Sequence, residues 1–237
     1  LYVDVTSFDA KATTKYSSHN TTRYGASYNI ESFSVNANEW ELLDSAGYYV
    51  QNHFLRATRT LSIGRASAYA THLWSPYISD TSTLGVELGL RWTYNDLTSE
   101  SIISPRLHLR YRPQPSMALR FSTGLYANTP MLKEMQRIDG TFNTKLKAQR
   151  EWHYIFGMDH DFQMGEKPFR LTAEAYYKRL TQVNPYSISN VKITYMADNC
   201  ASGYAYGADV RISGELATGV ESWLTLSYLK AMEKHDS

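Results

Sequence analysis

Residues 84–94 read LGVELGLRWTY, and this stretch decides the fold. Every second residue in it is large and apolar, namely Leu84, Val86, Leu88, Leu90, Trp92 and Tyr94. The residues between them are small or polar and include Glu87 and Arg91. Because successive side chains of a β-strand point to opposite faces, the stretch predicts a strand with one apolar face and one polar face.

The same alternation recurs along most of the chain, and helical periodicity is nearly absent. The predicted strands lie at about 4–16, 21–34, 65–76, 84–94, 106–112, 117–126, 151–162, 169–178, 204–213 and 221–233. With their flanks they are roughly 10–14 residues long, whereas strands of globular proteins most often have about 5–6 residues. A tilted strand that crosses a membrane needs about 9–11 residues. The sequence therefore predicts an all-β fold in which about ten antiparallel strands cross a membrane.

The connections between the predicted strands alternate between short and long. The short ones are 17–20, 77–82, 114–116, 163–167 and 215–220, and the long ones are 35–64, 96–102, 129–148 and 182–199. Outer-membrane barrels have short turns at the periplasmic end and longer loops at the extracellular end. The pattern predicts an up-and-down transmembrane β-barrel in which each strand pairs with its neighbours in sequence.

Composition argues against several other classes of protein. The 237 residues carry a net charge of +1, without a basic or acidic run, so no surface for nucleic acid is expected. No stretch reaches about 18 consecutive apolar residues, the length of a membrane-spanning helix. With a single cysteine, Cys200, no intrachain disulfide can form. Because no motif of a hydrolase, a nucleotide-binding enzyme or a zinc protease is present, we expect no catalytic residue, no cofactor and no metal site.

Aromatic residues make up 14% of the chain and gather near the ends of the predicted strands. Near the short connections lie Trp74, Tyr77, Tyr111, Phe162, Phe169 and Trp223, and near the opposite ends lie Trp92, Tyr94, Tyr176 and Tyr177. Two aromatic belts are expected where a barrel meets the two membrane–water interfaces. The general preference of strands for aromatic residues is the alternative explanation.

Several stretches resemble TonB-dependent outer-membrane receptors. These stretches are LGVELGLRWTYND (84–96), ISPRLHLRYRP (103–113), MALRFSTGLYANTPMLKEM (117–135), REWHYIFGMDHDF (150–162), FRLTAEAYYKRLTQV (169–183) and GYAYGADVRISGEL (203–216). The resemblance covers about residues 65–233. The segments TPMLKEM and LKAQREWHYIFGMDHDF are most similar to receptors of the Bacteroidetes group.

The resemblance implies a barrel of about 22 strands in the outer membrane, closed by an N-terminal plug domain. Residues 1–237 are then part of the barrel wall, without the plug and without the closing C-terminal strand. Such receptors import a scarce nutrient, such as an iron chelate, haem, cobalamin or a glycan, with energy supplied through TonB. The implied partners are outer-membrane lipid, the receptor's own plug, the TonB complex through the missing N-terminal part, and a small nutrient ligand. A surface lipoprotein is a further candidate partner. A passive porin-like channel and a secreted all-β binding module are the alternatives.

Charged residues on the polar strand faces are candidates for contact with a plug or with an anionic ligand. They are Glu87, Arg91, Arg106, Arg110, Glu151, Glu174, Asp209 and Arg211. A hydrated wall of mixed charge is the alternative. Ligand-binding residues are expected in the long connections, because binding residues are often carried on loops. The candidates are Trp40, Tyr48, Tyr49 and His53 in 35–64 and Lys133 and Arg137 in 129–148, against the alternative of ordinary loop composition.

Overall fold

The main sheet has ten strands and is antiparallel throughout. The computed structural model describes residues 2–45, 48–137, 141–189, 192–217 and 219–235, with the side chains of 2, 35–59, 189 and 192 outside the description. The strands are β1 (Tyr2–Ser17), β2 (Asn20–Ser45), β3 (Tyr48–Trp74), β4 (Thr83–Asn95), β5 (Glu100–Gln114), β6 (Met117–Asn128), β7 (Gln149–Met164), β8 (Lys167–Val183), β11 (Ala201–Ala217) and β12 (Val220–His235). Each pairs with the preceding and following strands of this sheet in chain order, β8 with β11 included, which confirms the predicted up-and-down order.

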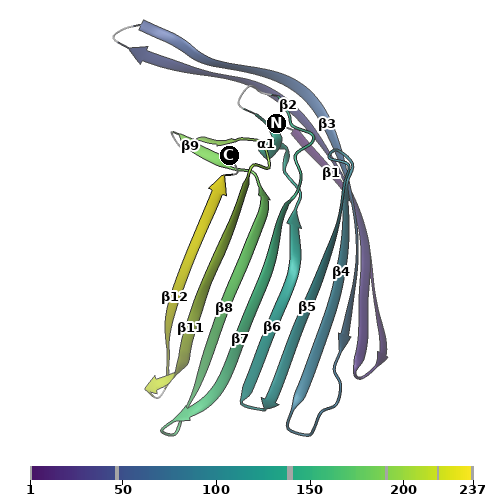
Figure 1. The fold of residues 1–237 in the computed structure, drawn as a ribbon, viewed down its shortest axis with the longest axis vertical. Helices are drawn as coiled ribbons and strands as arrows, with labels where there is room; N and C mark the ends of the chain where they lie inside the picture. The colour runs from purple at the N-terminus through teal and green to yellow at the C-terminus, as the bar shows by residue number, and fades with distance from the viewer. Residues whose placement is uncertain (1, 46–47, 138–140, 190–191, 218, 236–237) are drawn as a thin grey trace.

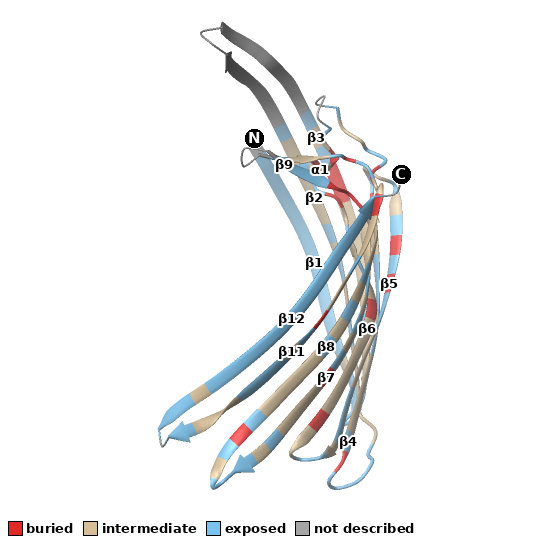
Figure 2. Ribbon diagram, turned by 60° about the vertical axis from the view of Figure 1, so that its left-hand side comes forward, coloured by how far each residue is buried: buried red, intermediate tan, exposed pale blue. Residues whose placement is uncertain are grey.

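The sheet is a curved wall whose two edge strands stay apart. β1 and β12 lie at opposite sides of the wall in Figure 1, and they do not pair with each other. Both strands are exposed along almost their whole length, as the pale blue ribbons of Figure 2 show. Each edge therefore presents backbone N–H and C=O groups that lack a strand partner among the described residues.

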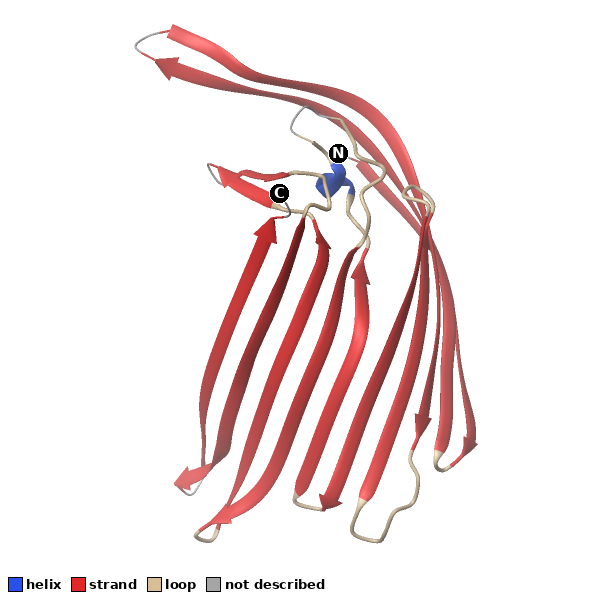
Figure 3. Ribbon diagram, in the orientation of Figure 1, coloured by secondary structure: helices blue, strands red, loops and turns tan. Residues whose placement is uncertain are grey.

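The two ends of the wall differ in structure. Two-residue turns join β1 to β2, β5 to β6 and β7 to β8 at one end, called here the turn end, which is at the bottom of Figure 1. The other end, called the loop end, carries the short helix α1 (Leu132–Met135) and a separate hairpin formed by β9 (Tyr186–Ser189) and β10 (Lys192–Tyr195) (Figure 3). Among the described residues, no helix is long and apolar enough to cross a membrane.

The predicted connection lengths are partly wrong. The stretch 35–64 was taken as a long loop, but 35–45 belong to β2 and 48–64 to β3, and their pairing continues past the rim up to Ser45 opposite Tyr48. The connection 96–102 is only a four-residue turn, because β5 already begins at Glu100. At the turn end the eight residues between β3 and β4 form a longer connection than that turn. Backbone pairing with a partner strand extends these strands where their own sequence alternates poorly.

The register sorts the side chains of the wall into two faces. Leu88 lies opposite Leu107 and Leu90 opposite Pro105, so the apolar residues of neighbouring strands share one face, called here the apolar face. The large side chains on this face are the more exposed ones: Leu88 is 55% exposed and Phe156 54%, whereas Glu87, on the other face, is half-buried. A protein folded in water shows the opposite order. The apolar face is therefore built to contact lipid.

Aromatic side chains on the apolar face form the predicted belts, with three exceptions: Tyr176, Trp223 and Tyr77, the last of which lies in the β3–β4 connection opposite Thr83. The loop end carries a cluster of rings that extends across four strands, with centroids 6.1–6.5 Å apart in the contacting pairs: Trp152, Tyr154, Tyr177, Tyr204, Tyr206 and Tyr228. At the turn end, Phe162 stacks on Phe169 at 5.9 Å. Tyr176 and Trp223 point to the opposite, polar face, because they lie one residue out of phase with the apolar positions.

The two faces predict opposite responses to the same charge. Leu88→Arg places a cation on the apolar face at mid-strand, where a charge in hydrocarbon costs a barrel about 2–4 kcal/mol. Glu87→Arg changes only the polar face and is expected to cost much less. The measurement is a denaturant titration of the full-length receptor refolded into lipid vesicles. Equal losses of unfolding free energy would contradict a lipid-facing side, and a larger loss for Glu87→Arg would mean that the faces are reversed.

Candidate functional site

The eight charged residues predicted for the polar face all lie on that face. The pairs that fix this are Gly85 with Arg110, Glu87 with His108, Arg91 with Ser104, Arg106 with Gly124, Tyr126 with Glu151, Gly157 with Glu174, Glu174 with Asp209, and Thr172 with Arg211. Residues directly opposite in antiparallel strands share a face, so the register carries this assignment from β4 across to β11.

A hollow of about 290 Å³ lies on the polar face toward the loop end. Its lining comes from β2 to β6 and the residue that follows: Asn29, Arg65, Ala66, Ser67, Arg91, Thr93, Ser104, Arg106, Ala127, Asn128 and Thr129. The lining holds three arginines, several hydroxyl and amide groups, and no carboxylate. We call this cavity the arginine hollow. Its donors are of the kind that bind carboxylate, phosphate or another oxyanion.

Each arginine of the hollow is held in a different way. Arg65 donates to Glu31 at 2.9 Å, and both side chains are about four-fifths buried. The Nε of Arg65 is buried without a hydrogen-bond partner among the described residues. Arg91 donates to the Ser67 hydroxyl at 3.3 Å. Among the described residues, Glu31 is the one carboxylate that forms an ion pair with an arginine of the hollow, so the hollow keeps an excess of positive charge.

Arg106 belongs to a stack that joins three strands. Its guanidinium lies 4.4 Å from the centroid of the Tyr126 ring, and that ring stacks on His153 with centroids 4.4 Å apart. His153 Nε2 is 2.8 Å from a carboxylate oxygen of Glu151. Gly124 makes room for this stack, because a Cβ there would lie 3.0 Å from the Arg106 side chain. Arg106 and Glu151, both predicted for the polar face, are thus connected through Tyr126 and His153, which were not among the predicted site residues.

The polar face is basic on one side and acidic on the other. Arg120 reaches across Gly157 and pairs with Asp159 at 3.2 Å. Farther along the same row, Glu174 lies directly opposite Asp209 in the register. Like charges opposite one another repel. Neither carboxylate forms an ion pair within the described part of the chain.

Of three further predicted residues on the polar face, two form no ion pair among the residues described and one packs over an aromatic ring. Glu87 and Arg110 have no ion pair among the residues described, and Glu87 lies opposite His108 rather than Arg110. Arg211 lies over the Trp223 ring at 5.6 Å. The structure therefore brings only Arg91 and Arg106 together in one cavity, with Arg65 as the member that sequence reasoning missed.

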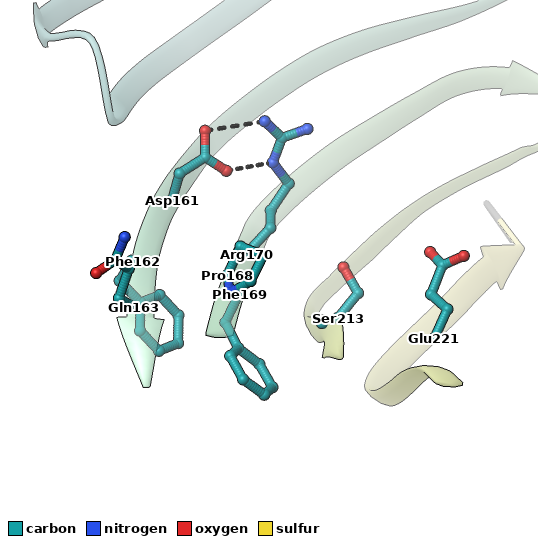
Figure 4. A pocket seen from close by; sticks show the side chains of 9 residues that line it. Asp161, Phe162, Gln163, Pro168, Phe169, Arg170, Ser213 and Glu221 are labelled. Carbon is teal, nitrogen blue, oxygen red and sulfur yellow. Dashed lines mark hydrogen bonds and ion pairs between the residues drawn. The ribbon is translucent and has the colours of Figure 1, made fainter. Parts of the chain in front are cut away.

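A shallow pocket at the turn end has a different character. Figure 4 shows Asp161 and Arg170 joined by two hydrogen bonds, of 2.6 and 2.9 Å, with Ser213 and Glu221 on the neighbouring strands. His160, between Asp159 and Asp161 in sequence, lies on the apolar face beside Phe162. No group of three or more His, Cys, Asp or Glu side chains suited to a metal occurs among the residues described.

The loops above the arginine hollow form a compact layer, called here the loop plate. Its apolar centre is buried and consists of Leu132, Met135, Leu146, Ala148, Ala197 and Ala201. Asn184 is 4% exposed, donates to Glu134 O at 2.9 Å and accepts from Asp198 N at 3.2 Å. Asn143 donates to Ala197 O at 2.8 Å. Hydrogen bonds of these amide side chains thus link the β6–β7 connection to the β8–β11 connection.

Glu100 and Asn199 make further hydrogen bonds within the loop plate. Glu100 accepts from the backbone N–H of Ala148 at 2.7 Å and from Arg150 at 2.9 Å. Asn199 accepts from Lys147 N at 2.7 Å and donates to Lys147 O at 3.0 Å. The bonds of Glu100 and Asn184 are part-buried, and they favour one conformation because each one that breaks leaves an unsatisfied polar atom. The loop plate is a preformed surface.

The six predicted loop residues are divided between two places. Lys133 and Arg137 are exposed on the loop plate. Trp40, Tyr48, Tyr49 and His53 lie in the paired part of β2 and β3 beyond the rim, with Trp40 opposite Phe54 and Tyr49 opposite Asp44. Their placement in a loop was wrong, and their side chains lie outside the described residues.

A curved antiparallel wall with a lipid-facing side and a charged inner side defines a membrane-spanning β-barrel protein. The family described as TonB dependent receptor-like, beta-barrel, matches residues 2–234. The chain therefore belongs to this family. No curated protein matches the chain.

Three solved structures have the same fold at low sequence identity. The FrpB iron transporter of Neisseria meningitidis is 13% identical with a TM-score of 0.69, over 99% of this chain and 37% of that one. The outer-membrane transporter YddB of Escherichia coli is 13% identical with a TM-score of 0.67, over 98% and 34%. The ferric enterobactin receptor PfeA of Pseudomonas aeruginosa is 15% identical with a TM-score of 0.70, over 96% and 36%. The chain thus spans about a third of the length of each of these proteins.

Asn184 provides a test of the loop plate. Asn184→Ala removes two buried hydrogen bonds, and leaving their partners unsatisfied costs about 1–3 kcal/mol. We expect faster amide hydrogen exchange at residues 129–137 and 192–200, by roughly tenfold or more. The control is Lys133→Ala, an exposed residue of α1 on the β6–β7 side of the loop plate, and it should leave exchange unchanged. Unaltered protection in Asn184→Ala would show that the amide contacts do not hold the two connections together.

Proposed function

We propose that this chain is part of the barrel wall of an outer-membrane receptor that imports a scarce nutrient with energy supplied through TonB. The observation that carries the proposal is the arginine hollow on the polar face, in a chain that matches the receptor family from residue 2 to residue 234. A wall of this kind encloses a lumen, and a charged hollow inside a lumen can hold a passing anionic solute.

The orientation of the wall follows from its two ends. Tight turns lie at one end, and the loop plate with the β2–β3 hairpin lies at the other (Figure 1). Since outer-membrane barrels have their short turns in the periplasm, we place the loop plate outside the cell. A nutrient, or a surface lipoprotein that carries one, would meet the loop plate first and the arginine hollow next. A plug inside the lumen would contact the polar face nearer the turn end.

An anionic nutrient fits the arginine hollow better than a neutral one. Three guanidinium groups, of which Arg65 alone forms an ion pair with a described carboxylate, Glu31, favour a ligand with carboxylate, phosphate or similar oxygens. Among iron chelates, haem, cobalamin and glycans, we therefore propose an acidic iron chelate or haem ahead of a neutral glycan. Two of the structurally similar proteins are named as an iron transporter and a ferric enterobactin receptor, which supports the first choice. The segments TPMLKEM and LKAQREW support a receptor of the Bacteroidetes group.

Uptake by cells tests the proposal directly. Cells that express the full-length receptor should accumulate labelled iron chelate or haem only when TonB is functional. Arg91→Gln with Arg106→Gln should weaken uptake by about tenfold for each guanidinium group removed. The matched control is Lys11→Gln, which lies on the polar face in β1, three strands from Arg91, and does not line the hollow. Uptake that continues at the same rate without TonB would favour a passive porin-like channel.

A further inference from the structure

Three cations interrupt the apolar face at its loop end. Arg179 of β8 shares this face with Tyr177, and Lys230 and Lys234 of β12 share it with Tyr228. Other cations of the face have partners: Arg150 pairs with Glu100 at 2.9 Å, and Lys167, at the turn end, donates to Leu216 O at 3.0 Å.

The register brings the three cations close to one another. Arg179 lies opposite Tyr204, and Tyr204 lies opposite Met232, so these residues form one row. Lys230 and Lys234 stand two residues before and after Met232 on the same strand face. β8 and β12 are separated by one strand, which is a spacing of about 10 Å. Long flexible side chains at these positions can converge on one head group.

None of the three cations is neutralised by the described part of the chain. All three side chains are exposed, and no ion pair found among the described residues includes them. A charge on the lipid side of a barrel costs about 2–4 kcal/mol at the bilayer midplane and close to nothing near the interface. These cations therefore belong at an interface.

The aromatic belt fixes the level of that interface. Arg179 stands in the same row as Trp152 and Tyr204, and Lys230 stands in the row of Tyr177 and Tyr206. Trp and Tyr rings mark the level of the lipid head groups. The cations thus lie where phosphate groups of lipids lie, and the surface just below them is apolar and exposed, with Leu224 and Leu226 more than 70% exposed.

We propose that Arg179, Lys230 and Lys234 form a binding site for the phosphorylated head group of a lipid in the outer leaflet. The planar guanidinium of Arg179 can donate two parallel hydrogen bonds to one phosphate, and the two ammonium groups add positive charge around it. Acyl chains of the same lipid would lie along Leu226, Leu224 and Ile212. This continuity with the acyl-contacting surface favours a lipid over a soluble anion.

The proposal rests on the membrane orientation proposed above and is independent of nutrient import. The three cations lie on the face opposite the arginine hollow, so removing them leaves the hollow intact. A loss of lipid binding with normal import, or a loss of import with normal lipid binding, would separate the two proposals.

The test measures lipid binding to the purified full-length receptor in detergent micelles. The probe is a bis-phosphorylated glycolipid, compared with its dephosphorylated form and with inorganic phosphate. The triple variant R179Q/K230Q/K234Q should bind the phosphorylated lipid at least tenfold more weakly than the unchanged receptor, with the affinity for the dephosphorylated lipid unchanged. Lys178→Gln, next to Arg179 but on the polar face, is the matched control and should have no effect.

Single variants keep the proposal testable if the triple variant fails to fold. R179Q should lose most of the difference between the two lipids, and R179K should lose less because it keeps the charge. Equal affinity of the R179Q variant and the unchanged receptor for the phosphorylated lipid would overturn the proposal. So would an equal loss in Lys178→Gln, or displacement of the lipid by inorganic phosphate at matching concentrations, which would indicate a general anion site.

Discussion

Backbone hydrogen bonding is the constraint on which this structure depends. In lipid no water is present to satisfy an N–H or C=O group, so a sheet can cross a membrane only when each strand pairs on both sides. The described residues meet this requirement across eight strands, and β1 and β12 have a partner on one side only. A wall of this kind is expected to be stable in a membrane only as part of a closed barrel.

The same constraint sorts the side chains and so creates the sites. Once every strand is paired, successive residues must face lipid or lumen, and the register carries that division unchanged from strand to strand. On the lumen side, the small residues Gly124 and Gly157 allow Arg106 and Arg120 to lie flat across the sheet toward their partners. On the lipid side, the charges of the described residues lie near the strand ends, and the apolar middle, such as Leu88, is exposed.

Much of the fold could be predicted from the sequence, because strand alternation is a local property. The segment 84–94 and those like it have period-two patterns strong enough to fix strand, face and topology. The hairpin beyond the rim was missed because 35–64 alternates weakly, and pairing between two strands decided its structure. Of the three arginines in the hollow, Arg65 was not predicted. It lies beside Arg91 because of the pairing between β3 and β4, and the pattern of a single strand does not show that register. The loop plate depends on amide contacts of Asn184 between distant segments, which leave no periodic signal.

The central claim is that one face of the wall contacts lipid and the other contacts a wet lumen. Single fluorophores attached at positions 84–94 of the full-length receptor, with Cys200 replaced by serine, test this claim most directly. A quencher dissolved in the lipid should reach labels at the even positions, and a water-soluble quencher should reach those at the odd positions. This period-two alternation should hold along the whole strand. Quenching that does not alternate, or that alternates in the opposite phase, would contradict the account.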